Sequence, residues 1–448
     1  MGRFARVALV ACVVSVPALA DPFPLFGYGP RAAAMGGAMT AEANDFTAVF
    51  YNPALLTRRK ELNFGFGFQF HRLVSEVTPV SEVTPKGLAK PIDCAQCNAP
   101  DNLGATTGFV FPLAGKVKNR LAIGVGLYLP TSTLVRVNAP DATQPYWYRY
   151  NGNLERFVLH LGLGIKVTDW LSVGPGVSVL ANLQGRVGGG GGANANVDLF
   201  SRNVTLKSLD ASLTPRAAPT LGVAVTPLKN LRFGATYRWE IFLPVTIPAT
   251  IDLEGIGTLA LTVNAVAHYA PHQVSFGAAW DVTDQLTLSL DGEYQHWSAA
   301  PSPYVSLSVD LSGPTLAALG IDKALDLNVQ AASPGFVNTF GGRLGGEYRV
   351  SERFAARLGL SYRPTMVPLQ NVAGTNLLDA NTVGLATGIG FNFSDPLEIF
   401  EHPIQIDFAL QAAFLLQREA TKPTTDVLPS YTYAGRVFGG MAMIRYDF

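Results

Sequence analysis

Apolar and polar residues alternate along much of the chain, and a period of two is typical of β-strands. Every second residue from Leu62 to Phe70 is large and apolar, and the residues between them are Asn, Gly and Gln. Successive side chains of a strand point to opposite faces. The segment therefore predicts a strand with one apolar face and one small or polar face. The last residues, Ile444 to Phe448, repeat the pattern.

Counting the segments with this alternation predicts about fourteen strands. They are expected at 61–71, 105–113, 120–130, 153–167, 170–186, 214–226, 231–241, 274–282, 285–295, 335–350, 353–363, 382–393, 403–417 and 432–448. Single-chain outer-membrane barrels of bacteria have an even number of strands. The pattern predicts an all-β fold, with a transmembrane antiparallel β-barrel over residues 61–448.

The connections between these segments alternate in length. Tight turns such as Thr168-Asp169, Thr283-Asp284 and Ser351-Glu352 are followed by long stretches, for example 187–213, 244–261 and 298–334. Tight turns at one rim and long loops at the other are the layout of outer-membrane barrels. Pro175 and Pro219 fall inside predicted strands. Each removes a hydrogen-bond donor, so we expect a bulge or a shifted strand boundary there.

Residues 1–20 are typical of a secretory signal peptide. Arg3 and Arg6 precede a short apolar stretch, and Ala18-Leu19-Ala20 is a small-residue cleavage site. An exported chain favours disulfides. Cys94 and Cys97 are therefore interpreted as a possible local disulfide.

The charge composition bears on both the surface of the protein and its partners. Charged residues make up only 15% of the chain. Soluble domains usually carry roughly 25%, so the deficit fits a surface facing lipid. The 33 basic residues are balanced by 33 acidic ones, so nothing favours binding to nucleic acid.

Residues 21–60 precede the first strand and do not alternate. Turns and short helices are expected there. Wide barrels are often plugged, so we expect this segment, called the hatch below, to fold inside the barrel. The alternative is a loose periplasmic tail, which its apolar composition disfavours.

Several motifs resemble those of the FadL family, which includes OmpP1 and TodX. The residues are Gly29-Pro30-Arg31-Ala32-Ala33-Ala34-Met35-Gly36-Gly37, Asn44-Asp45, Phe50-Tyr51-Asn52-Pro53-Ala54, Gly124-Val125-Gly126 with Pro130, Trp147-Tyr148-Arg149-Tyr150 and Val167 to Gly174. The resemblance implies a fourteen-stranded outer-membrane channel for long-chain fatty acids and hydrocarbons. It also implies ligand capture in an apolar outer groove, rearrangement of the hatch around Asn52, Pro53 and Ala54, and lateral release beside a kinked third strand. That strand would contain Gly124, Gly126 and Pro130.

Arginines on the polar faces of the strands are candidates for a ligand carboxylate, because guanidinium binds carboxylate in a fork. Arg186, Arg343 and Arg357 are the candidates that we single out. The alternative is that such arginines form cross-strand ion pairs in a solvated lumen.

We expect no enzyme, metal site or other cofactor. His268 and His272 have the same parity, but no carboxylate or thiolate at a fitting spacing completes a metal site. The sequence contains no Gly-x-Ser-x-Gly motif, which a lipid hydrolase of the common type would carry.

The function predicted is passive uptake of long-chain fatty acids or other hydrophobic molecules by a monomer in contact with outer-membrane lipid. An outer-membrane lipid hydrolase and an adhesin or receptor barrel acting through its outer loops are the alternatives.

Overall fold

A computed structural model describes the chain at residues 23–80, 97, 99–131, 140, 144–151, 157–186, 193–198, 203–208, 210–253, 257–318, 320, 333–368, 375–394, 402–422 and 428–448. The expected signal peptide lies outside the described residues.

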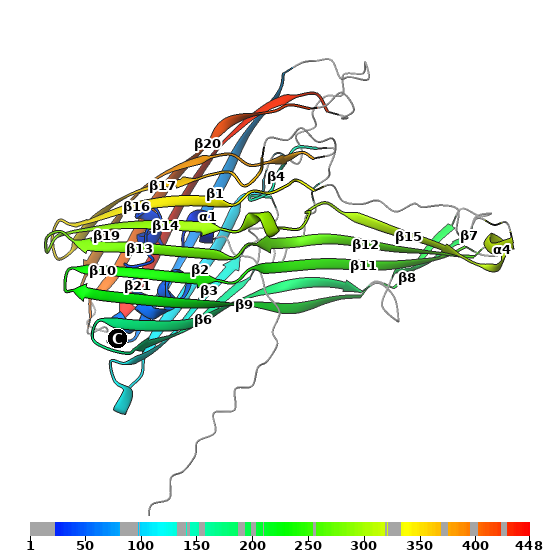
Figure 1. Cartoon of the computed structure of the whole chain (residues 1–448). Helices are drawn as coiled ribbons and strands as arrows, with labels where there is room; N and C mark the ends of the chain where they lie inside the picture. Colours follow the sequence, from blue (N-terminus) through cyan, green and yellow to red (C-terminus); the bar gives the residue numbers. More distant parts are fainter. Residues whose placement is uncertain are drawn as a thin grey trace, which may run out of the picture.

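Fourteen antiparallel strands form a closed barrel, as the alternation predicted (Figure 1). In order around the wall they are β1 (Asn63–Pro79), β2 (Asn102–Pro112), β3 (Leu121–Pro130), β5 (Val158–Lys166), β6 (Leu171–Arg186), β9 (Asp210–Leu228), β10 (Leu231–Arg238), β13 (Gln273–Asp281), β14 (Leu286–Gln295), β16 (Thr339–Arg349), β17 (Phe354–Arg363), β19 (Thr382–Phe393), β20 (Ile404–Ala420) and β21 (Tyr431–Asp447). The first and last strands pair from Asn63 opposite Asp447 to Pro79 opposite Tyr431, which closes the wall.

The wall separates apolar from polar side chains as the sequence pattern requires. In β1 the four phenylalanines from Phe64 to Phe70 are exposed on the outside, and Gln69 and His71 are buried on the inside. An apolar exterior band of this kind suits contact with lipid. The closed barrel also leaves no unpaired strand edge in the membrane. No described helix is both long and apolar enough to span a bilayer.

A second sheet extends the barrel at the rim of the long connections (Figure 1). Its strand order is β15 (Ser306–Ser312), β12 (Gly257–Ala270), β11 (Ile241–Leu253), β7 (Ala193–Asp198) and β8 (Asn203–Ser208), and we call it the outer sheet. Three segments that the sequence analysis treated as loops therefore contain strands. A short parallel pair, β4 (Tyr146–Trp147) with β18 (Leu377–Leu378), lies at the same rim. The short helices in the described connections of the barrel are α4 (Pro314–Ala318) and the 3-10 turns η3 (Gly115–Val117) and η4 (Trp297–Ala299).

The described part of the hatch consists of short helices inside the barrel. These are α1 (Phe23–Phe26), α2 (Pro30–Ala34), α3 (Ala48–Tyr51) and the 3-10 helix η1 (Pro53–Arg58). α2 contacts β17, β19, β20 and β21, and η1 contacts β3, β5, β6 and β9. Phe23, Tyr28 and Phe46 are almost fully buried there. The hatch thus reaches several sides of the wall at once and fills the lumen with an apolar core.

Candidate functional site

The hatch is anchored to the wall through Asn52. The extended backbone of Asn52 ends α3, and its side-chain oxygen accepts a hydrogen bond from the Ala54 N–H at 3.2 Å. This bond caps η1. The Asn52 amide donates to the carbonyls of Thr40 and Val223, both at 2.9 Å. Asn52 is fully buried, so one side chain joins two parts of the hatch to strand β9.

Glycines form the surface on which this turn rests. A Cβ added at Gly174 would lie 2.2 Å from the Ala54 nitrogen, and one at Gly222 would lie 2.1 Å from the Asn52 side-chain oxygen. At Gly234 it would lie 2.0 Å from the Thr40 carbonyl. Real Cβ atoms cannot approach so closely. The wall therefore lacks side chains where the backbone of the hatch must come nearest.

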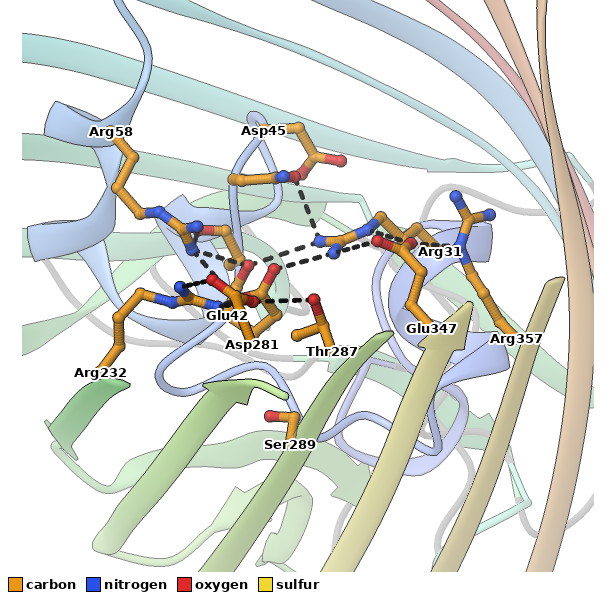
Figure 2. A network of polar contacts seen from close by, with 12 residues as sticks. Arg31, Glu42, Asp45, Arg58, Arg232, Asp281, Thr287, Ser289, Glu347 and Arg357 are labelled. Carbon is orange, nitrogen blue, oxygen red and sulfur yellow. Dashed lines mark hydrogen bonds and ion pairs between the residues drawn. The ribbon is translucent and has the colours of Figure 1, made fainter. Parts of the chain in front are cut away.

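A network of buried ion pairs joins the hatch to the wall (Figure 2). At its centre, Arg31 lies between Glu42 of the hatch, at 2.9 Å, and Glu347 of β16, at 2.8 Å. The other pairs are Arg232–Glu42 (2.6 Å), Arg232–Asp281 (2.5 Å), Arg58–Glu42 (3.4 Å), Arg357–Glu347 (2.6 Å), Arg357–Asp407 (2.5 Å), Arg445–Asp407 (2.6 Å) and Arg445–Asp45 (3.0 Å). Each charge has an opposite partner, so the network is compatible with burial.

The carboxylates of the hatch are held in the charged form. Burial raises the pKa of Glu42, but Arg58, Arg31 and Arg232 outweigh it and place the pKa below the usual 4.5. Burial also raises the pKa of Asp45, and Arg445 together with the Thr47 hydroxyl lowers it below the usual 3.8. Nearby positive charges and donated hydrogen bonds favour the ionised form of a carboxyl group. Both groups therefore carry a negative charge at neutral pH.

Two cavities flank the hatch on either side of Phe50. The first, of about 90 Å³, is lined by apolar hatch residues such as Phe23 and Leu25 and by the wall residues His71, Gln411 and Arg343. The second, of about 80 Å³, lies at the base of β11 and β12 and is lined by Ile241, Tyr269 and Trp297 among others.

Arg238 separates the two cavities together with Phe50. Its guanidinium lies 4.3 Å from the centre of the Phe50 ring and donates to the Phe50 carbonyl at 2.5 Å. A cavity of about 150 Å³ binds a molecule as small as benzene. Neither cavity therefore has room for a long aliphatic chain.

The arginines proposed for a ligand carboxylate lie in different surroundings. Arg343 lines the first cavity and pairs with Glu293 at 2.8 Å. Arg357 belongs to the ion-pair network, and Arg186 lies at the end of β6, where the structure describes only the backbone. Arg363 lines the same cavity as Arg343 and donates to the Tyr150 hydroxyl at 2.7 Å, and its buried Nε has no partner among the described residues.

Strand β3, expected to be kinked, pairs regularly with both neighbours. It faces β2 without interruption from Ala122 to Pro130 and β5 from Leu121 to Tyr128. Gly124 and Gly126 point inward, where added Cβ atoms would meet Leu56 and Tyr28 of the hatch.

The expected disulfide remains a prediction. Cys97 is buried with its Sγ 3.7 Å from the Pro145 carbonyl, and Cys94 lies outside the described residues.

Cross-strand ion pairs of wall arginines were one of the two alternatives drawn from the sequence, but the part that the hatch contributes to the network was missed. Its signal was present, because Arg31, Glu42 and Asp45 are isolated charges in an apolar segment. Such charges require partners when they are buried. Those partners lie on distant strands, so the sequence alone does not identify them.

Comparisons with known proteins agree with this architecture. Residues 15–438 match the family described as outer membrane protein transport protein (OMPP1/FadL/TodX). Alkane uptake protein A of Marinobacter nauticus is 22% identical over 443 residues, which cover 93% of this chain and 89% of that protein.

Solved structures share the fold. A FadL homologue of Pseudomonas aeruginosa is similar with a TM-score of 0.60 and 17% identity, covering 97% of this chain and 99% of that one. The toluene transporter TbuX of Ralstonia pickettii has a TM-score of 0.54 and 18% identity, covering 95% and 100%. TodX, a toluene transporter of P. putida, has a TM-score of 0.56 and 14% identity, covering 95% and 99%.

Proposed function

Because the chain belongs to the outer membrane protein transport family of OmpP1, FadL and TodX, we propose that it carries long-chain aliphatic molecules inward by passive diffusion. Members of this family are channels of the bacterial outer membrane for hydrophobic compounds and are not enzymes. The finer proposal concerns the ligand and its route.

The observation that carries this proposal is the hatch itself. It contacts strands on several sides of the lumen, and aromatic and aliphatic side chains line part of the first cavity and most of the second. A chain of sixteen carbons gains about 12 kcal/mol on leaving water, at roughly 0.8 kcal/mol per CH₂. A route without water therefore favours such a ligand, whereas a sugar would lose its hydration on entering it. Transport down a gradient then needs no cofactor.

The apolar face of the outer sheet is suited to capture. On one face Leu259, Leu261 and Val263 of β12 lie opposite Leu311, Val309 and Leu307 of β15. The same face continues toward the barrel through Ala265, which is paired with Val245, and both pack against the buried core of the hatch. An apolar ligand adsorbed on the sheet would thus meet similar surface all the way to the second cavity.

The ligand's head group distinguishes a fatty acid from a hydrocarbon. A carboxylate in the first cavity would meet Arg363, whose Nε has no partner among the described residues, and Arg343, which would have to exchange Glu293 for the ligand. The name of alkane uptake protein A favours a neutral chain for that relative. We propose that aliphatic length is the primary requirement and that an acid is accepted through these two arginines.

The test is uptake of radiolabelled oleate and hexadecane by cells that lack other channels for these compounds. Expression of the full chain should raise the uptake of at least one ligand. The double variant Arg343→Met/Glu293→Gln, which removes both charges of this pair, should reduce oleate uptake and spare hexadecane. The exposed pair Arg436–Glu76 provides a matched control, Arg436→Met/Glu76→Gln. If neither ligand enters faster with the protein than without it, the proposal is wrong.

The alternative functions predict other results. A lipid hydrolase would be labelled by a serine-reactive lipid probe, and a channel would not. An adhesin or receptor barrel would bind its partner through the outer sheet and leave uptake unchanged.

A further inference from the structure

The pairing of β5 with β6 is interrupted within the barrel wall. The strands pair from Val158 opposite Leu180 to Gly162 opposite Gly176, and again from Ile165 opposite Val173. Leu163 and Gly164 are not paired with β6, although the register is the same on both sides of the gap. Elsewhere in the described wall, the register shifts lie close to strand ends, between Leu231 and Phe233 and between Leu415 and Arg418. We call the interrupted stretch of β5 and β6 the seam.

Pro175 accounts for the interruption. Proline has no N–H to donate to a ladder. β6 pairs continuously with β9 from Leu171 to Arg186, so the ladder is lost only on the β5 side. The Pro175 side chain is exposed on the outer face. The wall therefore lacks strand pairs at a position that faces the membrane.

The inner side of the seam has no side chains of its own. Four glycines line it, namely Gly162 and Gly164 of β5 and Gly174 and Gly176 of β6. Hatch atoms occupy the space instead: added Cβ atoms at Gly162 and Gly176 would meet Pro53, at 3.3 and 3.0 Å, and one at Gly164 would meet Leu56 and Thr57 at 3.0 Å. The turn after Asn52 thus covers the seam from within.

The seam also lies near a cavity. Ser178 lines the second cavity and lies on the same inward face of β6 as Gly176 and Gly174. Phe50 lines that cavity as well, and it lies two residues before Asn52, where the turn that covers the glycines begins. Between the cavity and the seam, the hatch therefore lies against a row of small residues of β6.

We infer that the seam between β5 and β6 is the lateral exit of this channel and that the Asn52-Pro53-Ala54 turn is its inner cover. This inference rests on the proposed function, because it assigns the route of the same ligand. It differs from the expectation for β3, whose ladders are unbroken. When the turn moves, a ligand in the second cavity faces bare glycine backbone and two missing strand pairs, beyond which lies lipid.

Disulfide clamps test the exit. In a Cys94→Ser/Cys97→Ser background, Leu161→Cys/Val177→Cys and Ile165→Cys/Val173→Cys would join paired residues on either side of the gap. The matched control is Phe111→Cys/Ile123→Cys, which joins β2 to β3 in the same way. Oxidised β5–β6 clamps should lose uptake of oleate or hexadecane and recover it with reductant, and the β2–β3 clamp should retain uptake.

The outcomes separate this inference from the proposed function. Loss of uptake in the β2–β3 clamp alone, in all clamps alike, or in none would overturn the β5–β6 exit. If the reduced proteins show no uptake, the proposed function itself fails.

A second pair of variants needs no crosslink. Pro175→Val restores an N–H to β6 and should slow uptake. Pro219→Val in β9, which pairs with β6 without a gap at this position, should leave uptake unchanged. Equal uptake by both variants and the unmodified protein would contradict the role of Pro175.

Discussion

Single side chains hold the hatch in place, and Asn52 is the clearest example. Its amide bonds two carbonyls that belong to different parts of the chain, Thr40 and Val223. Thr40 is buried, whereas Val223 is half-buried and also pairs with Ala235 of β10. Removing the amide therefore leaves the Thr40 carbonyl without this donor, which is the costly way to lose a hydrogen bond.

We predict that Asn52→Ala loosens the hatch without disturbing the wall. The expected loss is about 1–3 kcal/mol for each buried acceptor left unsatisfied. Limited proteolysis in detergent micelles should cleave the hatch faster, and the heat-modifiable migration of the folded barrel should persist. Asn392→Ala is the control, because Asn392 bonds the Glu352 carbonyl at an exposed turn. Equal cleavage of the two variants would contradict the anchoring role of Asn52.

Sequence reasoning at this scale identifies faces but not partners. Alternation placed Arg343 and Arg357 on the polar side of their strands, and the structure has them inside the barrel. It left open whether the arginines bind a ligand or pair within the protein. Arg357 meets Asp407 across 50 positions of sequence, and Arg445 meets Asp45 across 400. Such pairings depend on barrel closure, which no local pattern encodes.

At the scale of elements, the hatch and the wall are joined by charge as well as by apolar packing. Arg31 of α2 and Glu347 of β16 form the central contact of the network. Burying such a pair contributes little net stability, but removing one member leaves a charge in an apolar interior. The network therefore favours the seated position of the hatch over small displacements.

A double-mutant cycle should measure this coupling. We expect Arg31→Met and Glu347→Gln each to accelerate hydrogen–deuterium exchange of α2, and the double variant to exchange more slowly than the two effects added together predict. A coupling energy of about 0.5–3 kcal/mol is typical of residues in contact or in one ion-pair network. Strictly additive effects would mean that Arg31 and Glu347 do not act as a pair.

Acid should release the same contacts. The pKa values of Glu42 and Asp45 are lowered in the folded protein from their usual values of 4.5 and 3.8. Their contribution to stability is therefore complete above the usual values and is lost as pH falls through the lowered ones. The part of the hatch's protection from exchange that depends on these two carboxylates, corrected for the intrinsic rate, should be complete down to pH 4.5 and be lost below 3.8. In Glu42→Gln the fall should be smaller. A fall that begins near neutral pH would implicate other groups.

Elements of the barrel were predictable because each strand crosses one membrane and shows the same alternation. The outer sheet was not predicted, although β12 contains Leu259, Leu261 and Val263 at alternate positions. Its strands come from three separate connections, and Pro244 and Pro248 interrupt β11. Pairing between distant connections gives these segments their strand structure, and the sequence does not show which connections meet.

For the whole molecule, the sites proposed for capture, closure and exit lie along one path. The apolar face of the outer sheet leads to the second cavity, the hatch covers the inner side of β6, and the seam opens toward lipid. Each step keeps an apolar ligand away from water, so no single step needs an energy source. The outer sheet extends beyond the barrel rim, so it is the part first reached by ligand from outside (Figure 1).

The two faces of the outer sheet allow a matched test of capture. Leu261 lies opposite Val309 on the apolar face, and its neighbour Thr262 lies opposite Ser308 on the other face. Leu261→Gln places an amide on the apolar face and should reduce uptake most at low ligand concentration, because it weakens adsorption and leaves the later steps intact. Thr262→Gln adds the same group to the polar face and should transport normally. Initial uptake rates measured over a range of hexadecane or oleate concentrations distinguish the two, and equal rates for both variants would exclude the outer sheet from the path of the ligand.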